Sequence, residues 1–366
     1  MRLRGVHRSL MRATTPLLFL VAALALGACG RAAPSPPSPA SAPTSSSRPE
    51  PAVGAPADHV DAALQAALAR VVSQSDGHVA VTVLELETGA RASIDGGARM
   101  PMMSVFKLPL AIVTLAAIDD GTWSLDTAIP IAESELRPNV SPLAEAWKRG
   151  QTAPTLETML RLVLQESDNT AGDKLVTLNG GGAKIMARLA SMELRGIDIA
   201  EQEIEIAARL NCPSRAAPDG GWTPAAIDAC PPPSKDAAIA AAEHEMAEPP
   251  NGATADALVA MLARVQRGQV LSEASRRWLL TTLLGTNTGP MRLKGALPSG
   301  AQVAHKTGTG RSAGVIVAVN DVGIVTLPSG DHFAIAVLTS GSHADIASSE
   351  SIIAQLSRAS WDAFAR

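Results

Sequence analysis

The sequence of 366 residues contains no tyrosine, and aromatic residues make up only 2% of it. It also has no excess of basic residues, because 31 lysines and arginines stand against 35 aspartates and glutamates. Proteins that bind nucleic acids need a basic surface, and many stack aromatic side chains on the bases. We therefore expect no nucleic-acid partner. The absence of tyrosine also excludes a mechanism in which a phenol acts as the base.

Charged residues are few, at 18%, whereas hydrophobic residues reach 46%. This composition is typical of a globular chain rather than a disordered one. The length allows one large domain or two modest ones, with a substantial buried core.

Residues 1–28 have the features of a secretory signal. Four arginines and no acidic residue precede an apolar run at residues 17–26, which is too short to span a bilayer as a mature helix. The run ends in the sequence LGAC, which resembles the lipobox of bacterial lipoproteins. This resemblance implies that Cys29 is acylated and becomes the first residue of the mature protein. The alternative is an ordinary cleavage site beside an incidental cysteine.

Residues 29–57 are rich in proline, serine and alanine, a composition that cannot form a core and is typical of a semi-extended tether. Residues 58–366 then form the folded domain. Removal of residues 1–28 leaves 27 basic and 35 acidic residues, so the exported protein carries a net charge of −8. We expect an exported, periplasmic monomer that touches the membrane only through its lipid anchor. Gly30, which follows the cysteine, favours the outer membrane by analogy with enteric lipoproteins.

Two cysteines remain in the exported chain, Cys212 and Cys230. In an oxidising compartment we expect them to form a disulfide that closes a short loop rich in proline and glycine. Metal binding is the weaker alternative, because two distant cysteines without a nearby histidine supply too few ligands. We predict no metal and no organic cofactor.

The order of the predicted elements indicates an α/β fold. A helix over residues 61–72 is followed by strands at 78–87 and 91–94, joined by a turn at Thr88-Gly89. A long helical section runs from about 104 to 284, further strands are predicted at 302–306, 314–319, 323–327 and 332–339, and a helix at 344–364 closes the chain. Strands at both ends predict an antiparallel sheet built from the N- and C-terminal segments with flanking helices, plus an inserted all-α lobe. We expect a catalytic cleft between the two.

Three short motifs carry the chemistry. In SVFK, Ser104 and Lys107 stand three residues apart where a helix begins, so they share one helix face and the amine can activate the hydroxyl. The sequence SDN begins at Ser167 and includes Asn169, and KTG begins at Lys306. S-x-x-K alone is common by chance. The three motifs in this order form the signature of class A β-lactamases and penicillin-binding proteins.

The chain resembles class A serine β-lactamases over residues 57–366. The stretches RMPMMSVFKLPL and HKTGTG are similar to that family's nucleophile helix and third motif. A segment from SDN to IAEQEIEI aligns without a gap and places the family's Ω-loop glutamate on Glu203. Glu243 is a rival position that needs a 40-residue shift, and Glu166 is interpreted as a plain helix residue.

The resemblance implies the following roles. Ser104 attacks the lactam carbonyl of a penicillin or cephalosporin, Lys107 and Glu203 share the removal of its proton, and Glu203 activates the water that deacylates the enzyme. Ser167, held by Lys107 and Lys306, passes a proton to the leaving nitrogen. The backbone N–H groups of Ser104 and Thr309 form the oxyanion hole. The implied substrate-binding residues are Asn169, Thr307, Gly308, Thr309 and Arg292, the last as the anchor of the substrate carboxylate.

Three residues depart from the family's pattern: Ala207 replaces an asparagine beside the water, Glu201 replaces a basic Ω-loop residue, and Val140 replaces a rim aromatic. Between Glu203 and Lys306 the chain is also roughly 35 residues longer than usual by this alignment. We therefore expect a different device to hold the Ω-loop.

Two alternative functions remain. A D,D-peptidase shares all three motifs but lacks the Ω-loop glutamate, and a lipoprotein that binds β-lactams without turnover would lack deacylation. The sequence GRSAG at residues 310–314 matches a nucleophile elbow. That motif requires a following helix, whereas strand-like residues follow here. His305 and His343 are interpreted as structural.

Overall fold

The computed structural model describes residues 57–365, with the exception of residues 138 and 313. The predicted signal, almost all of the tether and Cys29 lie outside the described residues. No described helix is long and apolar enough to cross a membrane.

The central sheet has the strand order β1-β3-β2-β8-β7-β6, so segments from both ends of the domain lie side by side in it. Its bounds are β1 His59–Val60, β2 His78–Glu85, β3 Ala90–Ile94, β6 Gln302–Ser312, β7 Val315–Thr326 and β8 His332–Ser340. N-terminal β2 pairs antiparallel with C-terminal β8 along its whole length. The predicted antiparallel sheet is confirmed for five strands, while the two-residue β1 adds a parallel edge on β3.

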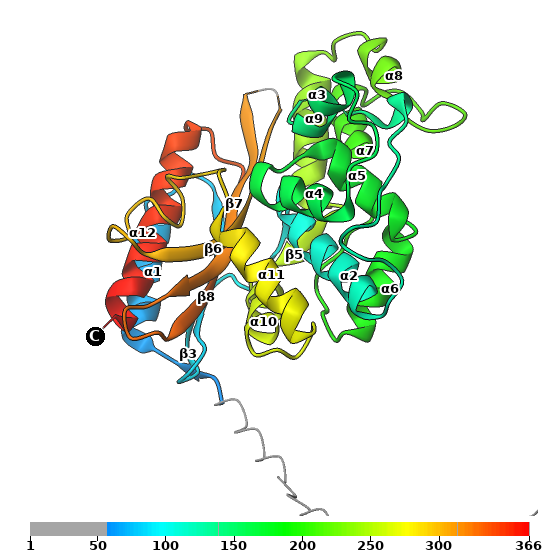
Figure 1. Ribbon diagram of the computed structural model, residues 1–366. Helices are drawn as coiled ribbons and strands as arrows, with labels where there is room; N and C mark the ends of the chain where they lie inside the picture. Colours follow the sequence, from blue (N-terminus) through cyan, green and yellow to red (C-terminus); the bar gives the residue numbers. More distant parts are fainter. Residues whose placement is uncertain (1–56, 138, 313, 366) are drawn as a thin grey trace, which may run out of the picture. The chain divides into compact units, whose positions relative to one another are not determined.

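Helices cover both faces of the sheet (Figure 1). On one face α1 (Ala62–Val72) packs beside α12 (Ile346–Phe364), and an apolar core that includes Leu68 and Phe333 lies between them and the strands. On the other face a second core joins the sheet to the inserted helical lobe. Because each face of the sheet packs against a core, β7 and β8 are buried along almost their whole length and are mostly apolar rather than alternating.

The inserted lobe and the helices beside it follow the predicted order. Their bounds are α2 Lys107–Asp119, α3 Pro142–Lys148, α4 Leu156–Arg161, α5 Asn169–Leu178, α6 Gly182–Ser191, α7 Glu203–Asn211, α8 Pro224–Asp228, α9 Lys235–Ala247, α10 Ala255–Gln266 and α11 Glu273–Leu284. A strand pair within this region was not predicted: β4 (Arg99–Pro101) pairs with β5 (Gly252–Thr254). Each strand has three residues, which is too short for an alternating pattern to be recognised.

The prediction of two strands at 314–319 and 323–327 is wrong, because β7 is a single strand. Asn320 and Asp321 have the polarity of a turn, but both side chains are buried and fully engaged. The Asn320 amide donates to the carbonyl of Pro101, and Asp321 pairs with His305 on β6. Satisfied polar groups allow a strand to continue through the core.

The strand predicted at 302–306 is too short, because β6 continues to Ser312. The chain then turns directly into β7, so the GRSAG sequence is followed by a strand and not by a helix. GRSAG is therefore no nucleophile elbow, although it is a turn only in part, because Gly310, Arg311 and Ser312 belong to β6.

Candidate active site

The nucleophile Ser104 lies in a 3₁₀ turn, Met103–Phe106, that leads directly into the buried helix α2. Met103, just before it, has a φ of 44°, a conformation that side-chain-bearing residues rarely adopt. Such backbone strain concentrates at functional sites, where the surrounding packing enforces it. The Asn320 amide, which donates to the carbonyls of Pro101 and Met102, helps to enforce it here.

Lys107 is fully buried, and its ammonium group joins the first two motifs. Its Nζ donates to Ser104 Oγ at 3.1 Å and to Asn169 Oδ1 at 2.6 Å. It also donates to the backbone carbonyl of Ser167 at 2.8 Å and reaches the Ser167 hydroxyl at 3.4 Å. Motifs separated by about 60 residues thus meet at one amine.

Ser167 is the second strained residue of the site, with a φ of 61° between the π-helical turn Leu162–Glu166 and α5. Asp168 fixes this geometry as the N-cap of α5, because its buried carboxylate accepts from the backbone N–H groups of Ala171 and Leu143. Burial raises the pKa of Asp168, although these hydrogen bonds act against the shift. Of the SDN motif, Ser167 and Asn169 therefore belong to the site, and Asp168 holds them in place.

Lys306 reaches the same hydroxyl from the sheet side. Its Nζ donates to Ser167 Oγ at 3.0 Å and to the carbonyl of Thr307 at 2.8 Å. Complete burial, followed by the nearby charge of Lys107, lowers the pKa of Lys306 well below its ordinary value. The Ser167 hydroxyl thus lies between the amines of Lys107 and Lys306 and can exchange a proton with either of them.

Glu203 completes the cluster from the first turn of α7. Its Oε1 accepts from the Ser104 hydroxyl at 3.1 Å and lies 3.0 Å from Lys107 Nζ. The rival Glu243 is exposed on α9 and is not among the residues that line the site. Glu166 also lines the cavity, but its carboxylate accepts from the Asn287 amide, whereas the carboxylate that accepts from Ser104 is that of Glu203. The gapless alignment therefore leads to the glutamate that contacts the nucleophile.

Sequence reasoning missed a buried support of Glu203, the carboxylate of Asp173 on α5. It accepts from the backbone N–H of Glu203 at 2.6 Å and of Ile204 at 3.2 Å, and it pairs with Arg137 at 2.6 Å. Burial raises the pKa of Asp173 to about 6. Asp173 lies four residues after Asn169 and so shares its helix face, a signal that could have identified it.

Strand β6 forms the opposite wall of the site and passes very close to the nucleophile. A Cβ at Gly308 would lie 2.4 Å from the carbonyl oxygen of Met102 and 3.2 Å from the backbone nitrogen of Ser104. Only glycine permits this approach, which brings Thr307 and Thr309 to the same cavity as Ser104.

Arg292 lines the cavity, but its guanidinium is largely engaged within the protein. It donates to the carbonyls of Gly308 and Asn320, each at 3.0 Å, and to the Thr309 hydroxyl at 2.7 Å, and it pairs with Glu350. Arg292 therefore contacts the substrate-binding residues of the site through its hydrogen bond to the Thr309 hydroxyl. Its direct contact with a substrate carboxylate stays a prediction.

One cavity of about 850 Å³ lies between the sheet and the helical lobe, and its lining includes Ser104, Ser167, Asn169, Glu203, Arg292, Thr307, Gly308 and Thr309. Lys107 and Lys306 are fully buried behind it. Val140 and Ala207, two of the departures from the family pattern, also line it. Glu201, the third, pairs with Arg209 of α7. Among the described residues no group of three or more His, Cys, Asp or Glu is arranged to hold a metal ion.

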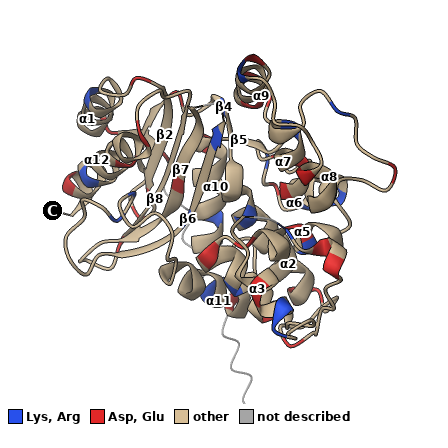
Figure 2. Ribbon diagram, turned by 90° about the horizontal axis from the view of Figure 1, so that it is seen from above, with Lys and Arg blue, Asp and Glu red and all other residues tan. Residues whose placement is uncertain are grey.

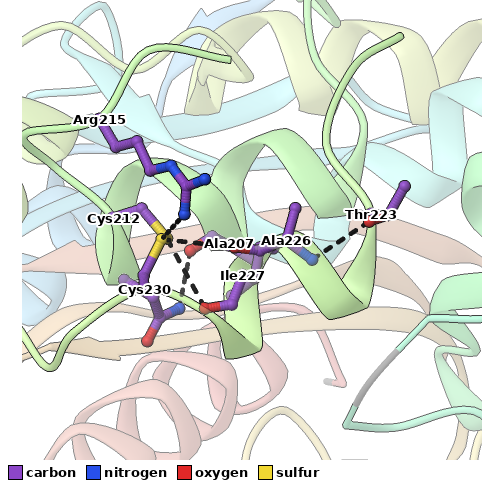
Figure 3. Close-up of a disulfide and its surroundings, with 8 residues drawn as sticks. Ala207, Cys212, Arg215, Thr223, Ala226, Ile227 and Cys230 are labelled. Carbon is purple, nitrogen blue, oxygen red and sulfur yellow. Dashed lines mark hydrogen bonds between the residues drawn. A yellow bond between two sulfur atoms is a disulfide. The ribbon is translucent and has the colours of Figure 1, made fainter. Parts of the chain in front are cut away.

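The predicted disulfide is present and joins the end of α7 to the segment after α8 (Figure 3). Cys212 and Cys230 have their Cα atoms 5.8 Å apart. Thr223 caps α8 within the closed loop by accepting from the N–H of Ala226.

A fold of this kind, with a serine, two lysines and a glutamate in one cleft, defines a serine hydrolase. A family model described as "Beta-lactamase enzyme family" matches residues 63–364. The chain therefore belongs to this family, and the resemblance to class A serine β-lactamases is confirmed.

Several known proteins are similar to this chain. Beta-lactamase VEB-1 from Pseudomonas aeruginosa is 28% identical over 80% of this chain and 87% of its own length. The extended-spectrum β-lactamase PER-1 from the same species is 28% identical over 72% and 75%. Among solved structures, a β-lactamase from Chitinophaga pinensis is 32% identical with a TM-score of 0.68, over 82% of this chain and 98% of that one. TLA-1 extended-spectrum β-lactamase is 30% identical with a TM-score of 0.69, over 83% and 98%.

Proposed function

We propose that this enzyme hydrolyses the β-lactam amide of penicillins and cephalosporins through an acyl-enzyme on Ser104, and that water activated by Glu203 releases the product. The observation that carries this proposal is the position of Glu203 Oε1, within hydrogen-bond distance of both Ser104 Oγ and Lys107 Nζ. A base so close to the nucleophile is suited to both halves of the reaction.

In the acylation half, Lys107 and Glu203 take the Ser104 proton as Oγ attacks the lactam carbonyl. The N–H groups of Ser104 and Thr309 stabilise the oxyanion. Ser167 gives its proton to the leaving nitrogen, since its hydroxyl accepts from Lys306 and lies beside Lys107. The depressed pKa of Lys306 makes this relay easier, because a buried amine releases its proton more readily.

Substrate binding uses the residues between these groups. Asn169, whose Oδ1 accepts from Lys107, presents its amide N–H groups to the acylamide of the substrate. The substrate carboxylate lies against Thr307, Gly308 and Thr309 on β6, with the Arg292 guanidinium supplying positive charge behind them.

In the deacylation half, Glu203 removes a proton from water as the water attacks the ester. An acyl ester of serine persists in water unless a base is positioned against it, and general-base catalysis contributes roughly 10²- to 10⁴-fold. Glu203→Ala is therefore expected to acylate through Lys107 and then to stall.

Intact-protein mass spectrometry after exposure to a penicillin tests this expectation. Glu203→Ala should carry one added substrate mass, the unmutated enzyme little, and the control Glu243→Ala should turn over almost normally. Accumulation on Glu243→Ala with free turnover by Glu203→Ala would contradict the assignment of the base. A wild type that gives one stoichiometric burst with a chromogenic cephalosporin would be a β-lactam binder, and one that cleaves D-alanyl peptides instead would be a peptidase.

We further propose that the enzyme is exported to the periplasm as a monomer and is held at the membrane by a lipid on Cys29. The support for this proposal is the apolar run that ends in LGAC and the low-complexity segment after it. A tether of this composition would allow the domain to move freely above the membrane surface.

A further inference from the structure

Helix α7, which begins with Glu203, is bound to α9 by a partly buried charged cluster that the catalytic proposal does not use. Arg209 on α7 pairs with Glu245 on α9, at 2.6 Å from Nη2 and 3.0 Å from Nε, and with Glu201 just before α7. Figures 1 and 2 show α7 and α9 side by side, and residues of the two helices are in contact. The cluster of Arg209, Glu245 and Glu201 is called the α7 anchor below.

The α7 anchor holds α7 in place because the carboxylate of Glu245 is buried and is paired with Arg209. Glu245 is 0% exposed, and its Oε1 has no hydrogen-bond partner among the described residues. Burial raises the pKa of Glu245, and the charge of Arg209 acts against this shift. Displacement of Arg209 would leave this buried carboxylate without its ion-pair partner, which is strongly unfavourable.

The chain before Glu203 is held from a second side. The Asn251 side chain accepts from the backbone N–H groups of Ala200 and Glu201 and donates to the carbonyl of Glu201. The backbone carbonyl of Asn251 accepts from the N–H of Met102, two residues before the nucleophile. Asn251 holds the residues just before α7, and Arg209 holds the helix itself. Together they restrain the position of Glu203, the first residue of α7.

We propose that Arg209 is a positioning residue for deacylation, which through its pairs with Glu245 and Glu201 holds the Glu203 carboxylate against Ser104. This inference rests on the proposed role of Glu203. Ser104, Lys107, Ser167 and Lys306 belong to other elements, so loss of the α7 anchor displaces the base of deacylation and leaves the remaining acylation machinery in place.

Slower deacylation has a kinetic signature that simple loss of folded enzyme does not produce. When breakdown of the acyl-enzyme becomes limiting, kcat and KM fall together, and kcat/KM falls much less than kcat, because kcat/KM reports only the steps up to acylation, for which Lys107 remains in place. A smaller fraction of folded enzyme lowers kcat at an unchanged KM.

Arg209→Met tests the proposal, since methionine keeps the apolar stem and removes the charge. With a chromogenic cephalosporin we expect kcat and KM to fall in parallel by about tenfold or more, because misplacement of a catalytic group by 1 Å can cost about 100-fold. The acyl-enzyme should accumulate in intact-protein mass spectra. Arg188→Met, which removes an exposed ion pair between α6 and the end of α2, is the matched control and should leave both constants unchanged.

Glu201→Gln is the second variant, because its side chain is 26% exposed and its loss does not threaten folding. A parallel fall of kcat and KM by a few-fold is expected from it. Unchanged constants in both variants, or a fall of kcat at constant KM, would overturn the proposal, and if Arg209→Met does not fold, Glu201→Gln decides alone. A wild type without turnover would instead refute the proposed function, and this inference with it.

Discussion

At the residue scale, the site depends on polar side chains that are buried and almost completely paired. Asp168 and Asp173 share α5: the first caps its own helix, and the second accepts from the first N–H groups of α7. Burial opposes the charge of each carboxylate, so each must accept hydrogen bonds from nearby backbone N–H groups. These hydrogen bonds hold the neighbouring catalytic residues in place. Asp173 acts on Glu203, whereas Asp168 acts on Ser167 and Asn169.

The raised pKa of Asp173 predicts a pH-dependent stability. Burial, with a smaller contribution from the charge of Glu203, raises this pKa to about 6, although Arg137 acts against the shift. Between the unfolded value near 3.8 and about 6 the folded protein binds more protons, so the free energy of unfolding falls as pH rises through this window. The fall amounts to at most about 3 kcal/mol.

Asp173→Asn removes this titration. Urea unfolding at pH 4, 5, 6 and 7 should show the variant gaining stability relative to the wild type as pH rises, up to about 3 kcal/mol. Parallel curves of unfolding free energy against pH for the two proteins would show that Asp173 does not titrate in this range.

At the element scale, α7 is restrained at both ends and along its length. Asp173 caps its first residues, the α7 anchor holds its last turns to α9, and Cys212 at its C-terminal end enters the disulfide. Glu201 stands where the family usually has a basic residue in the Ω-loop. In the α7 anchor the acidic residue is therefore in the loop and its basic partner, Arg209, is on α7. The α7 anchor and the disulfide are thus interactions that hold the Ω-loop in place of the family's usual salt bridge.

The disulfide should contribute stability through the loop that it closes. A sequence separation of 18 corresponds to about 3 kcal/mol in the chain-entropy model. Cys212→Ser/Cys230→Ser should therefore lower the free energy of unfolding by about this amount, measured by urea denaturation of oxidised protein. The wild type in reductant serves as the control and should match the variant. Two free thiols in protein purified from the periplasm, counted by mass spectrometry, would refute the pairing in the cell.

At the scale of the whole molecule, the catalytic cleft exists because β6 passes between the helical lobe and the rest of the sheet. Ser104 and Lys107 come from the start of α2, Ser167 and Asn169 from the start of α5, Glu203 from α7, and Lys306 from the sheet. Gly308 permits the close approach of β6 to the backbone of Met102 and Ser104. Catalysis therefore requires that the sheet and the lobe are correctly packed against each other.

The lipid anchor is the prediction that concerns the whole chain. Cys29→Ser should move the enzyme from the membrane fraction to the soluble periplasmic fraction and leave turnover unchanged, because the tether separates the lipid from the folded domain. Labelling with a radioactive or clickable fatty acid provides the direct measurement. Absence of label on the unmutated protein would refute acylation.

The sequence by itself determined the family, the order of the elements, the disulfide and the identity of the residues that meet at Ser104. These follow from local information: three motifs with fixed residue types, hydrophobic periodicity and one gapless alignment up to Glu203. The sequence also predicted the all-helical insertion, but it missed β4 and β5 and divided β7 at Asn320 and Asp321, because local polarity does not reveal that a side chain finds its partner in a distant strand.

Only the tertiary structure decided what supports the site. Asp173, Arg209, Glu245 and Asn251 have no motif, and each acts on a residue at least 30 positions away or on a different element. The guanidinium of Arg292 is largely engaged within the protein for the same reason, since Gly308, Asn320 and Glu350 reach it only when the sheet and α12 have assembled. Burial and pairing are properties of the packed molecule, and a sequence pattern specifies them only where the partners are near in the chain.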